Sequence, residues 1–300
     1  MLKPFIPGRP HWWQWLTVLS VDAPLVALVW QALFARLLDV ELFWYQSASL
    51  GLAVWVIYMA DRWIEGWRLS YETVLTQRHF FPIRWRWPVF WTGLVAALVA
   101  AWVAVAKLSG REWAAHAVLA VPTLTYLLSH QFVHRSHPSR VPKELCIAVL
   151  FALGTALEPA LVKLRPVWDR SGFLAALSSH QLDALWVPLG LFALLCLANV
   201  GLIAVWESDV DTQHGQTSIA LQLSGKVRLI RAFPWLLVPL GFWAALGGSG
   251  EMGRLAGSCV VLSASLMGAL DWLEPRIGRE AARALVDVTL LTPIAALFFL

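Results

Sequence analysis

Long apolar segments constrain this chain more than any other feature of its sequence. Of its 300 residues, 59% are hydrophobic and only 14% are charged. A helix needs about 20 consecutive apolar residues to cross the hydrocarbon core of a bilayer. Nine segments meet this requirement, at 15–38, 42–64, 88–108, 112–132, 144–162, 184–206, 229–248, 253–270 and 281–300. The sequence therefore predicts an all-α, multi-pass integral membrane protein with nine transmembrane helices and a single domain over residues 1–300.

The basic residues predict the orientation of these helices, because cytoplasmic connections are enriched in Lys and Arg. With the N-terminus inside, seven of the 23 Lys and Arg fall in outer segments and the other 16 fall in inner ones. The outer seven are Arg36, Lys107, Arg111, Lys163, Arg165, Arg170 and Arg254. We therefore expect a plasma or inner membrane location, a cytoplasmic N-terminus and a C-terminus on the opposite side.

Several function classes are disfavoured by composition. The basic residues are scattered over connections and form no stripe on one face, so nothing indicates a nucleic-acid partner. The three cysteines lie inside apolar segments, as small core residues do, and predict no disulfide framework. The histidines His79, His116 and His214 have no metal-ligand spacing, so a zinc site is rejected. The first apolar segment is too long for a signal peptide and is expected to remain as a span.

Two acidic pairs stand out among only 19 acidic residues. Asp61 and Glu65 are one helical turn apart at the end of the second apolar segment, and Glu207 and Asp211 are one turn apart at the end of the sixth. Like charges at this spacing repel on one helix face. Four apolar segments separate the pairs, as expected for two four-helix halves around a central cavity with a ninth helix appended. Both pairs then face the cytoplasmic side.

A hard divalent cation shared by the two pairs would relieve this repulsion. Mg²⁺ characteristically takes one or two carboxylates together with phosphate oxygens of a substrate. An isoprenyl diphosphate suits such a site, because its tail is hydrocarbon and its head is anionic. Nearby Arg or Lys could share the charge of the departing diphosphate, and aromatic faces could stabilise the allylic cation.

The residues around both pairs resemble the UbiA-type intramembrane prenyltransferases, which include 4-hydroxybenzoate polyprenyltransferase. Residues 61–65 (Asp-Arg-Trp-Ile-Glu) match the second half of the family's first motif, Asn-Asp-x-x-Asp-Arg-x-x-Asp. Residues 207–211 match the Asp-x-x-x-Asp core of the family's second motif, and residues 134–143 resemble the family's basic, Pro-containing loop. The family's leading Asn-Asp falls on Ile57 and Tyr58, and Glu replaces Asp at 65 and 207. The resemblance thus indicates a divergent member with nine helices.

The resemblance implies the roles of the site residues. Asp61, Glu65, Glu207 and Asp211 are expected to hold Mg²⁺ and to be catalytic, and Asp209 is a further candidate metal ligand. Substrate binding is assigned to Arg62, Arg68, Arg135, Lys143 and Asn199. Asn199 lies two turns before Glu207, where it either lines the cavity or forms an interhelical hydrogen bond. Asp22 lies inside the first apolar segment, as a pocket residue or as the partner of another helix.

The implied function is Mg²⁺-dependent transfer of an isoprenyl group from a prenyl diphosphate to an aromatic or lipid acceptor within the membrane. One alternative is a UbiA-type terpene cyclase, which needs no acceptor site and so fits the missing Asn-Asp. The other is a lipid-binding or transport protein without catalysis. Transporters often place their sites near the bilayer midplane, whereas these acidic pairs lie at helix ends.

Overall fold

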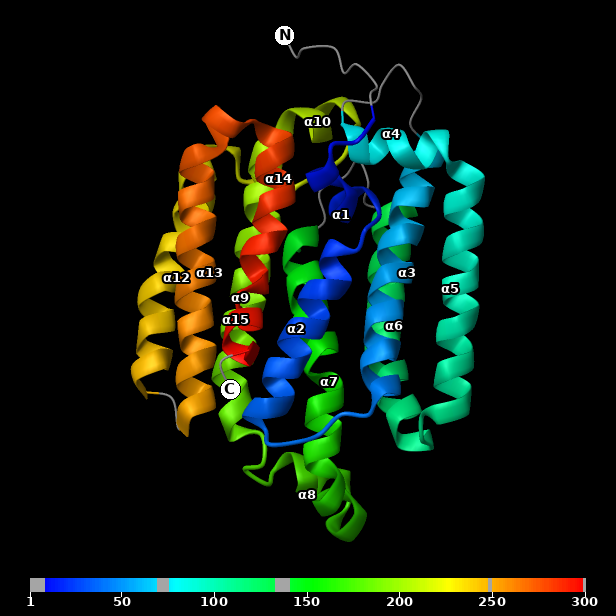
Figure 1. Ribbon diagram of the computed structural model, residues 1–300, viewed down its shortest axis with the longest axis vertical. Helices are drawn as coiled ribbons and strands as arrows, with labels where there is room; N and C mark the ends of the chain where they lie inside the picture. Colours follow the sequence, from blue (N-terminus) through cyan, green and yellow to red (C-terminus); the bar gives the residue numbers. More distant parts are fainter. Residues whose placement is uncertain (1–8, 69–75, 133–140, 248–249, 299–300) are drawn as a thin grey trace.

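Helices form all the regular secondary structure in the part of the chain that the structure describes. The computed structural model describes residues 9–68, 76–132, 141–247 and 250–298. Its long helices are α2 (Asp22–Leu37), α3 (Trp44–Arg68), α5 (Arg86–Lys107), α6 (Gly110–Phe132), α7 (Lys143–Ser171), α9 (Asp183–Trp206), α12 (Val227–Gly247), α13 (Gly250–Ile277) and α14 (Arg279–Val288), which continues through η3 (Thr289–Leu291) into α15 (Pro293–Phe298). They run roughly side by side along the long axis of the molecule (Figure 1).

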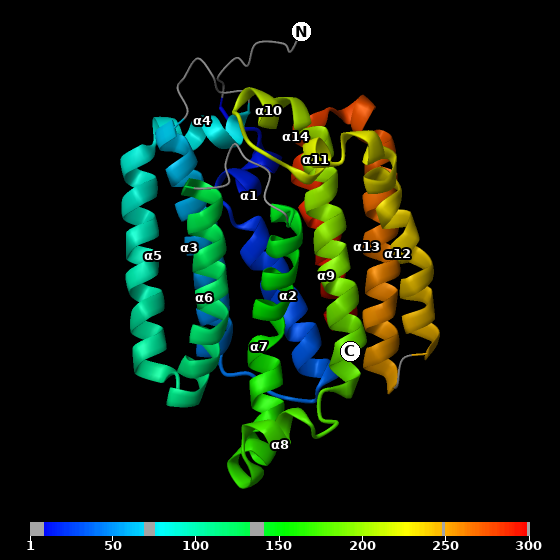
Figure 2. The ribbon, with the colours of Figure 1, turned by 180° about the vertical axis from the view of Figure 1, so that it is seen from behind.

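Six of these helical segments are long and apolar enough to cross a membrane, or seven if one bent pair is counted as a span. The six are α5, α7, α9, α13, Ser224–Gly247 and Arg279–Phe298. They establish a multi-pass integral membrane protein. Helices α3 and α6 contain two further predicted segments and run beside the others (Figure 2), but they carry more polar residues. The count of nine transmembrane helices therefore stays a prediction.

The first predicted segment, 15–38, is not one continuous helix. It is divided into α1 (Trp15–Val18) and α2, which meet at an angle of 77° when α1 is taken together with η1 (Trp12–Gln14). Ser20 lies between them with a φ of 57°, which no α-helical residue adopts. Asp22 is consequently the first residue of α2, directly after this break.

Short helices also occupy the two connections that follow the acidic pairs. The connection after α3 contains α4 (Gln77–Arg84). The connection after α9 contains α10 (Ser208–Gln213), α11 (Ile219–Gln222) and η2 (Ser224–Lys226). Figure 1 shows α4 and α10 across the same end of the bundle, above the helix ends that carry the acidic pairs. These helices cover that end, so the connections form part of the structure around the acidic residues.

The apolar core lies mainly between α2, α7, α9, α12 and α13. Trp30 and Phe192 are fully buried and stack with their ring centroids 4.2 Å apart. The Gly- and Ser-rich segment 253–270 lies within α13, where small residues permit close packing. A Cβ at Gly257 would collide with the backbone of Ala245 on α12. Gly and Ser make this segment less hydrophobic than the other predicted spans. Their small size, however, allows α13 to pack closely against α12.

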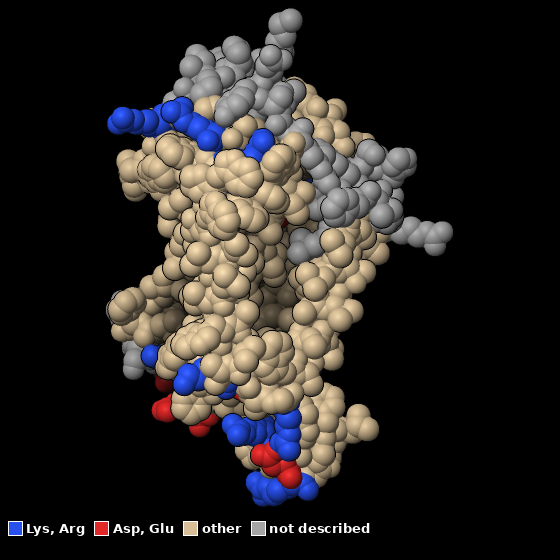
Figure 3. All heavy atoms as spheres, turned by 90° about the vertical axis from the view of Figure 1, so that its right-hand side faces the viewer, with Lys and Arg blue, Asp and Glu red and all other residues tan. Residues whose placement is uncertain are grey.

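Helix α5 lies away from this core and is mostly exposed. Only a small share of α5 is buried, and Trp87, Trp91 and Trp102 are exposed along it. The face shown in Figure 3 has Lys and Arg near both of its ends and Asp and Glu near the lower end, and the wide tan belt between the ends is hollowed. Such a belt is suited to contact with lipid tails.

Candidate active site

A cavity of about 490 Å³ lies between α3, α6, α7 and α9 and collects residues from both acidic segments. Asp61 reaches it from the last turns of α3, and Glu207 and Asp211 reach it from the junction of α9 with α10. The prediction that the two segments face one cavity is met by these three carboxylates. The structure describes the backbone of Glu65 within α3, but the side chain of Glu65 lies outside the described part.

The second acidic pair keeps its one-turn spacing although the helix changes direction there. Glu207 follows the last residue of α9, and the Asp211 backbone N–H donates to the Glu207 carbonyl at 2.9 Å. Glu207 is 4% exposed, so its carboxylate is almost fully removed from solvent. Burial raises the pKa of the Asp211 carboxyl above its ordinary value, and the nearby Glu207 carboxylate adds to this effect. The Lys143 ammonium opposes the shift in the pKa of Asp211.

Basic side chains stand beside these carboxylates. Arg78 on α4 donates from Nη2 to Glu207 Oε2 at 2.8 Å, which joins the short helix above the cavity to the end of α9. Lys143, the first residue of α7, also lines the cavity. The same end of the cavity therefore offers both carboxylate oxygens and cationic groups.

Two residues of this end were not singled out from the sequence. Glu144 is 2% exposed and lines the cavity. One of its oxygens, Oε1, accepts from the Ile219 backbone N–H at 3.0 Å, while Oε2 is buried without a hydrogen-bond partner. Arg283 of α14 also lines the cavity and donates to Asp287. The sequence signal for Glu144 was its place at the start of an apolar segment, where a carboxylate is costly.

Arg62 and Asn199, two of the residues predicted to bind substrate, both donate hydrogen bonds within the protein. Arg62 lines the cavity and is buried, and its guanidinium donates to the carbonyls of Thr17 and Val18, at the break before α2. Asn199 Nδ2 donates to Asp287 Oδ1 at 3.0 Å, so Asn199 forms the interhelical hydrogen bond that was one of its two alternatives.

Asp209 points away from the other acidic side chains. Its carboxylate accepts from Arg279 at 2.6 Å and from the Val210 backbone N–H at 2.8 Å, and the residue does not line the cavity. Arg135 and the side chain of Arg68 lie outside the described residues. Their predicted contacts with substrate stay predictions.

The middle of the cavity is apolar. Its wall there consists mainly of aliphatic side chains, with Tyr58, Tyr126 and Phe151 as the aromatic ones; the aliphatic residues include Val54, Ile57, Leu119, Leu124, Ile147 and Leu150. Tyr58 and Ile57, which replace the Asn-Asp of the resembled motif, thus both face this space. The site combines a charged end with an apolar body, which suits an amphipathic ligand.

Comparison with solved structures identifies this arrangement of helices. No protein-family model matches the chain, and no curated protein matches it. The apo structure of a UbiA homolog from Aeropyrum pernix K1 is similar with a TM-score of 0.60, over 93% of this chain and 98% of that chain, at 16% sequence identity. This chain has the UbiA fold. The UbiA-type fold expected from the two acidic motifs is therefore confirmed, although only 16% of the aligned residues are identical.

The described residues hold no group of three or more His, Cys, Asp and Glu side chains gathered closely enough to bind a metal ion. The three motif carboxylates and the unpaired Glu144 oxygen are nevertheless all hard oxygen donors in residues that line one cavity. Mg²⁺ needs only one or two carboxylates when a substrate supplies phosphate oxygens. The donor set of this UbiA fold therefore fits Mg²⁺ that arrives with a diphosphate.

Proposed function

We propose that this protein transfers an isoprenyl group from a prenyl diphosphate to an aromatic or lipid acceptor within the membrane, with Mg²⁺ as cofactor. The observation that carries the proposal is the cavity, because it joins the carboxylates of both acidic segments to a long apolar chamber. The diphosphate would occupy the charged end and the isoprenyl tail the apolar body. The likeness to a UbiA homolog supports the proposal through the fold.

The carboxylates of Asp61, Glu207 and Asp211 would hold Mg²⁺, with Glu144 Oε2 as a further donor. Bound there, Mg²⁺ would neutralise diphosphate charge and help that group to leave. Lys143 and Arg78 would contact the diphosphate oxygens and share the charge that builds up on them as the bond to carbon breaks. Arg78 is held against Glu207 in the structure, so binding of a substrate would exchange this ion pair for contacts with the diphosphate.

The apolar wall would protect the reactive carbon from water. An allylic cation is captured by any nucleophile within reach, so the chamber must exclude solvent until the acceptor reacts. The faces of Tyr58, Tyr126 and Phe151 could attract the cation through their ring electrons. Arg62 would not take part in the reaction itself. It would help to hold the shape of the site, because its guanidinium donates to the Val18 carbonyl at the break between α1 and α2.

A second candidate reaction is cyclisation, in which a double bond of the substrate itself captures the cation. The observation that favours it is the pair Ile57 and Tyr58, which line the cavity where the resembled motif has Asn-Asp. An isoleucine side chain cannot donate or accept a hydrogen bond, so position 57 offers no polar group to orient an external acceptor.

The test is diphosphate release by the purified protein with Mg²⁺ and prenyl diphosphates of several lengths, with and without aromatic and lipid acceptors. Acceptor-dependent release with an alkylated product is the expected result for transfer. Release without an acceptor together with a cyclic hydrocarbon product indicates cyclisation, whereas an alcohol as the product indicates capture of the cation by water. No release under any of these conditions would refute both reactions and favour a non-catalytic lipid-binding or transport role.

A further inference from the structure

A buried group of polar side chains connects the ninth long helical segment to the acidic end of the cavity. Its centre is Arg283 on α14, whose Nη1 donates to Asp287 Oδ2 one turn later on the same helix. Asp287 Oδ1 in turn accepts from Asn199 Nδ2 on α9 at 3.0 Å. Arg283 lines the cavity, whereas Asp287 and Asn199 do not. The group therefore presents its cationic member to the cavity and keeps the carboxylate that holds this cation behind the wall.

The protein uses the donors of Arg283 only in part. A guanidinium has five N–H groups and no acceptor. Nη1 is occupied by Asp287, but Nε is buried and finds no hydrogen-bond partner within the described part of the chain. The side chain keeps 12% of its surface exposed, so the cavity that it lines gives access to it. Since buried polar groups nearly always have partners, this guanidinium is suited to a further acceptor.

Three carboxylates lie near this guanidinium. Besides Asp287, both Glu207 and Asp22 attract Arg283 electrostatically. Glu207 also forms an ion pair with Arg78. It is one of the carboxylates proposed to hold Mg²⁺, and a carboxylate that binds a metal ion attracts its former partners less strongly. Binding of Mg²⁺ would thus leave both arginines ready to take oxygens of the diphosphate that accompanies the ion.

The positions of these two arginines support such a shared contact. Arg78, Glu207 and Arg283 line the main cavity and also a neighbouring cavity of about 30 Å³. The three side chains therefore stand together where the two cavities approach each other. Because Arg78 comes from α4 and Arg283 from α14, the cations reach this place from separate elements. A diphosphate has oxygens on two phosphorus atoms and can be held by both.

A second arginine on the same helix lacks these features. Arg279, one turn before Arg283, donates from Nη1 to Asp209 Oδ1 at 2.6 Å. Neither Arg279 nor Asp209 lines either of the two cavities. Both arginines thus pair with an aspartate, but only Arg283 reaches the space where a substrate would bind. Arg279 therefore provides a matched control on α14.

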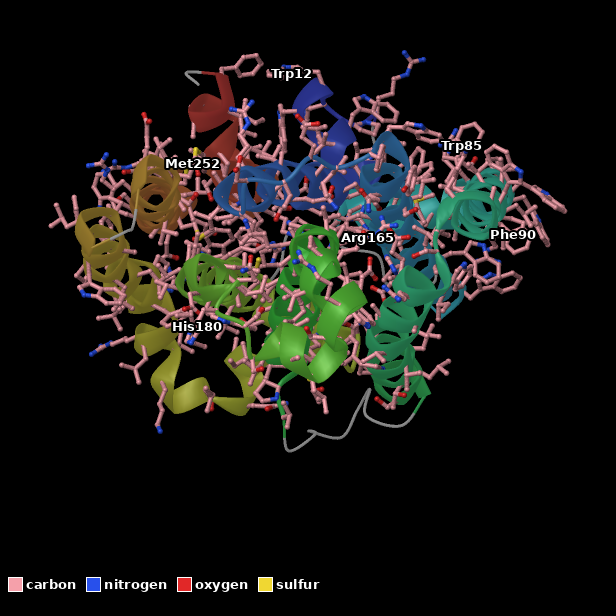
Figure 4. The ribbon with its side chains drawn as sticks, turned by 90° about the horizontal axis from the view of Figure 1, so that it is seen from below. Trp12, Trp85, Phe90, Arg165, His180 and Met252 are labelled. Carbon is pink, nitrogen blue, oxygen red and sulfur yellow. The ribbon has the colours of Figure 1, made fainter. Side chains whose placement is uncertain are left out.

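The opposite end of the cavity, which we call the far end, is polar but offers no such cation. Gln46 Nε2 donates there to Glu112 Oε1 at 2.9 Å and to Glu158 Oε2 at 3.0 Å, and His116 Nε2 lies 3.2 Å from Glu158 Oε1. Figure 4 views the molecule from this end; Arg165, labelled on α7, does not line the cavity. All Lys and Arg that line it within the described ranges belong to the acidic end. An anionic head group is therefore directed to the acidic end.

We propose that Arg283 binds the diphosphate group of the substrate and that Asp287, held by Asn199, positions Arg283 for this contact. The proposal rests on the proposed function and adds a residue of the last helical segment to its site. Arg283 donates to diphosphate oxygens and shares the negative charge that builds up on them as the group leaves. Asp287 fixes one side of the guanidinium, and the other N–H groups remain for the ligand.

The experiment compares wild type with Arg283→Met and Arg279→Met in the purified full-length chain. Calorimetric titration in the presence of Mg²⁺ measures the affinity for a non-hydrolysable farnesyl diphosphate analogue and for farnesol, which has the same tail and no phosphate. We expect Arg283→Met to weaken binding of the analogue by about 10- to 100-fold and to leave binding of farnesol within about twofold. Arg279→Met should bind both compounds like wild type.

Two further variants separate ligand contact from positioning. Arg283→Lys keeps the charge without the planar fork and should recover part of the affinity for the analogue that Arg283→Met loses. Asp287→Asn keeps an acceptor for Asn199 but removes the charge that holds the guanidinium. It should weaken binding of the analogue less than Arg283→Met does, again with farnesol unaffected. An effect on the analogue alone distinguishes positioning from a general loss of structure.

Arg283→Met leaves Asp287 buried without its cation, so a double variant with Asp287→Asn removes both charges and guards against loss of the fold. If this double variant binds the analogue as tightly as wild type, the role of Arg283 is overturned while the proposed function stands. An equal loss of affinity for farnesol and for the analogue also overturns that role. A wild type that does not bind the analogue with Mg²⁺ overturns the proposed function and this inference together.

Discussion

The two ends of the cavity both contain buried carboxylates, yet their neighbours differ. At one end Glu207 pairs with an arginine, and a lysine stands close to Asp211. At the other end Glu158 faces an imidazole and an amide. Fixed cations beside carboxylates suit the binding of a metal ion together with a diphosphate. The buried carboxylates thus have cationic partners at one end and an imidazole and an amide at the other.

The largest expected effect concerns the compartments that the two ends face. A reporter active only outside the cytoplasm should give full signal when fused to the C-terminus and none at the N-terminus, because the basic residues favour a cytoplasmic N-terminus. The acidic end would then open toward the cytoplasm and the His116 end toward the other side. Equal signals at both termini would mean an even number of spans.

Removal of a charge at the acidic end should abolish activity. Asp61→Asn and Asp211→Asn each take away a carboxylate that Mg²⁺ needs, and we expect diphosphate release to fall by at least about 100-fold with the fold intact. Steady-state release assays and a thermal melt measure the two properties. Asp183→Asn, which is exposed far from both motifs, is the control and should stay within about twofold of wild type. Normal activity of Asp61→Asn would exclude this carboxylate from the site.

Removal of the Arg78–Glu207 ion pair at the acidic end should have an intermediate effect. Arg78→Met removes a donor to Glu207 and a proposed diphosphate contact, so binding of a prenyl diphosphate should weaken by about 10- to 100-fold. Calorimetric titration measures the affinity. Arg84→Met, an exposed arginine on the same short helix, should bind like wild type. Equal affinities of the two variants would assign Arg78 a purely structural role.

The smallest effect is expected from the amide that joins the polar residues at the far end. Gln46→Leu removes hydrogen bonds to both Glu112 and Glu158 and should lower the free energy of unfolding by about 1–3 kcal/mol. Denaturant or thermal unfolding in detergent measures this loss, with the exposed Gln213→Leu for comparison. Unchanged stability would show that the Gln46 hydrogen bonds do not stabilise this end of the cavity. The two ends would then differ, because Arg78 and Glu207 form an ion pair at the acidic end.

The length of the apolar segments and the spacing of the motifs were enough to predict the helical membrane fold. They also predicted that Asp61, Glu207 and Asp211 line one cavity. The break at Ser20 was not predictable, because it depends on a single residue with positive φ inside an apolar segment. Asp209 was also predicted as a metal ligand, but its carboxylate accepts from Arg279, which lies 70 positions away along the chain. The orientation of such side chains depends on partners that are distant along the chain.

The far end of the cavity was missed for the same reason. His116 was considered only as a zinc ligand, and Glu158 was passed over within an apolar segment. Their contact joins α6 to α7 across 42 positions of the chain, and no local pattern connects them. The available signal was the cost of a carboxylate within a predicted span.

The central claim is that the acidic end binds a prenyl diphosphate through Mg²⁺, and titration with a non-hydrolysable prenyl diphosphate analogue tests it most directly. The account predicts that Mg²⁺ tightens binding to the wild type by at least about tenfold. This gain should vanish on chelation and in Asp61→Asn and Asp211→Asn, yet persist in His116→Gln. Affinity that is the same with and without Mg²⁺ would contradict the account.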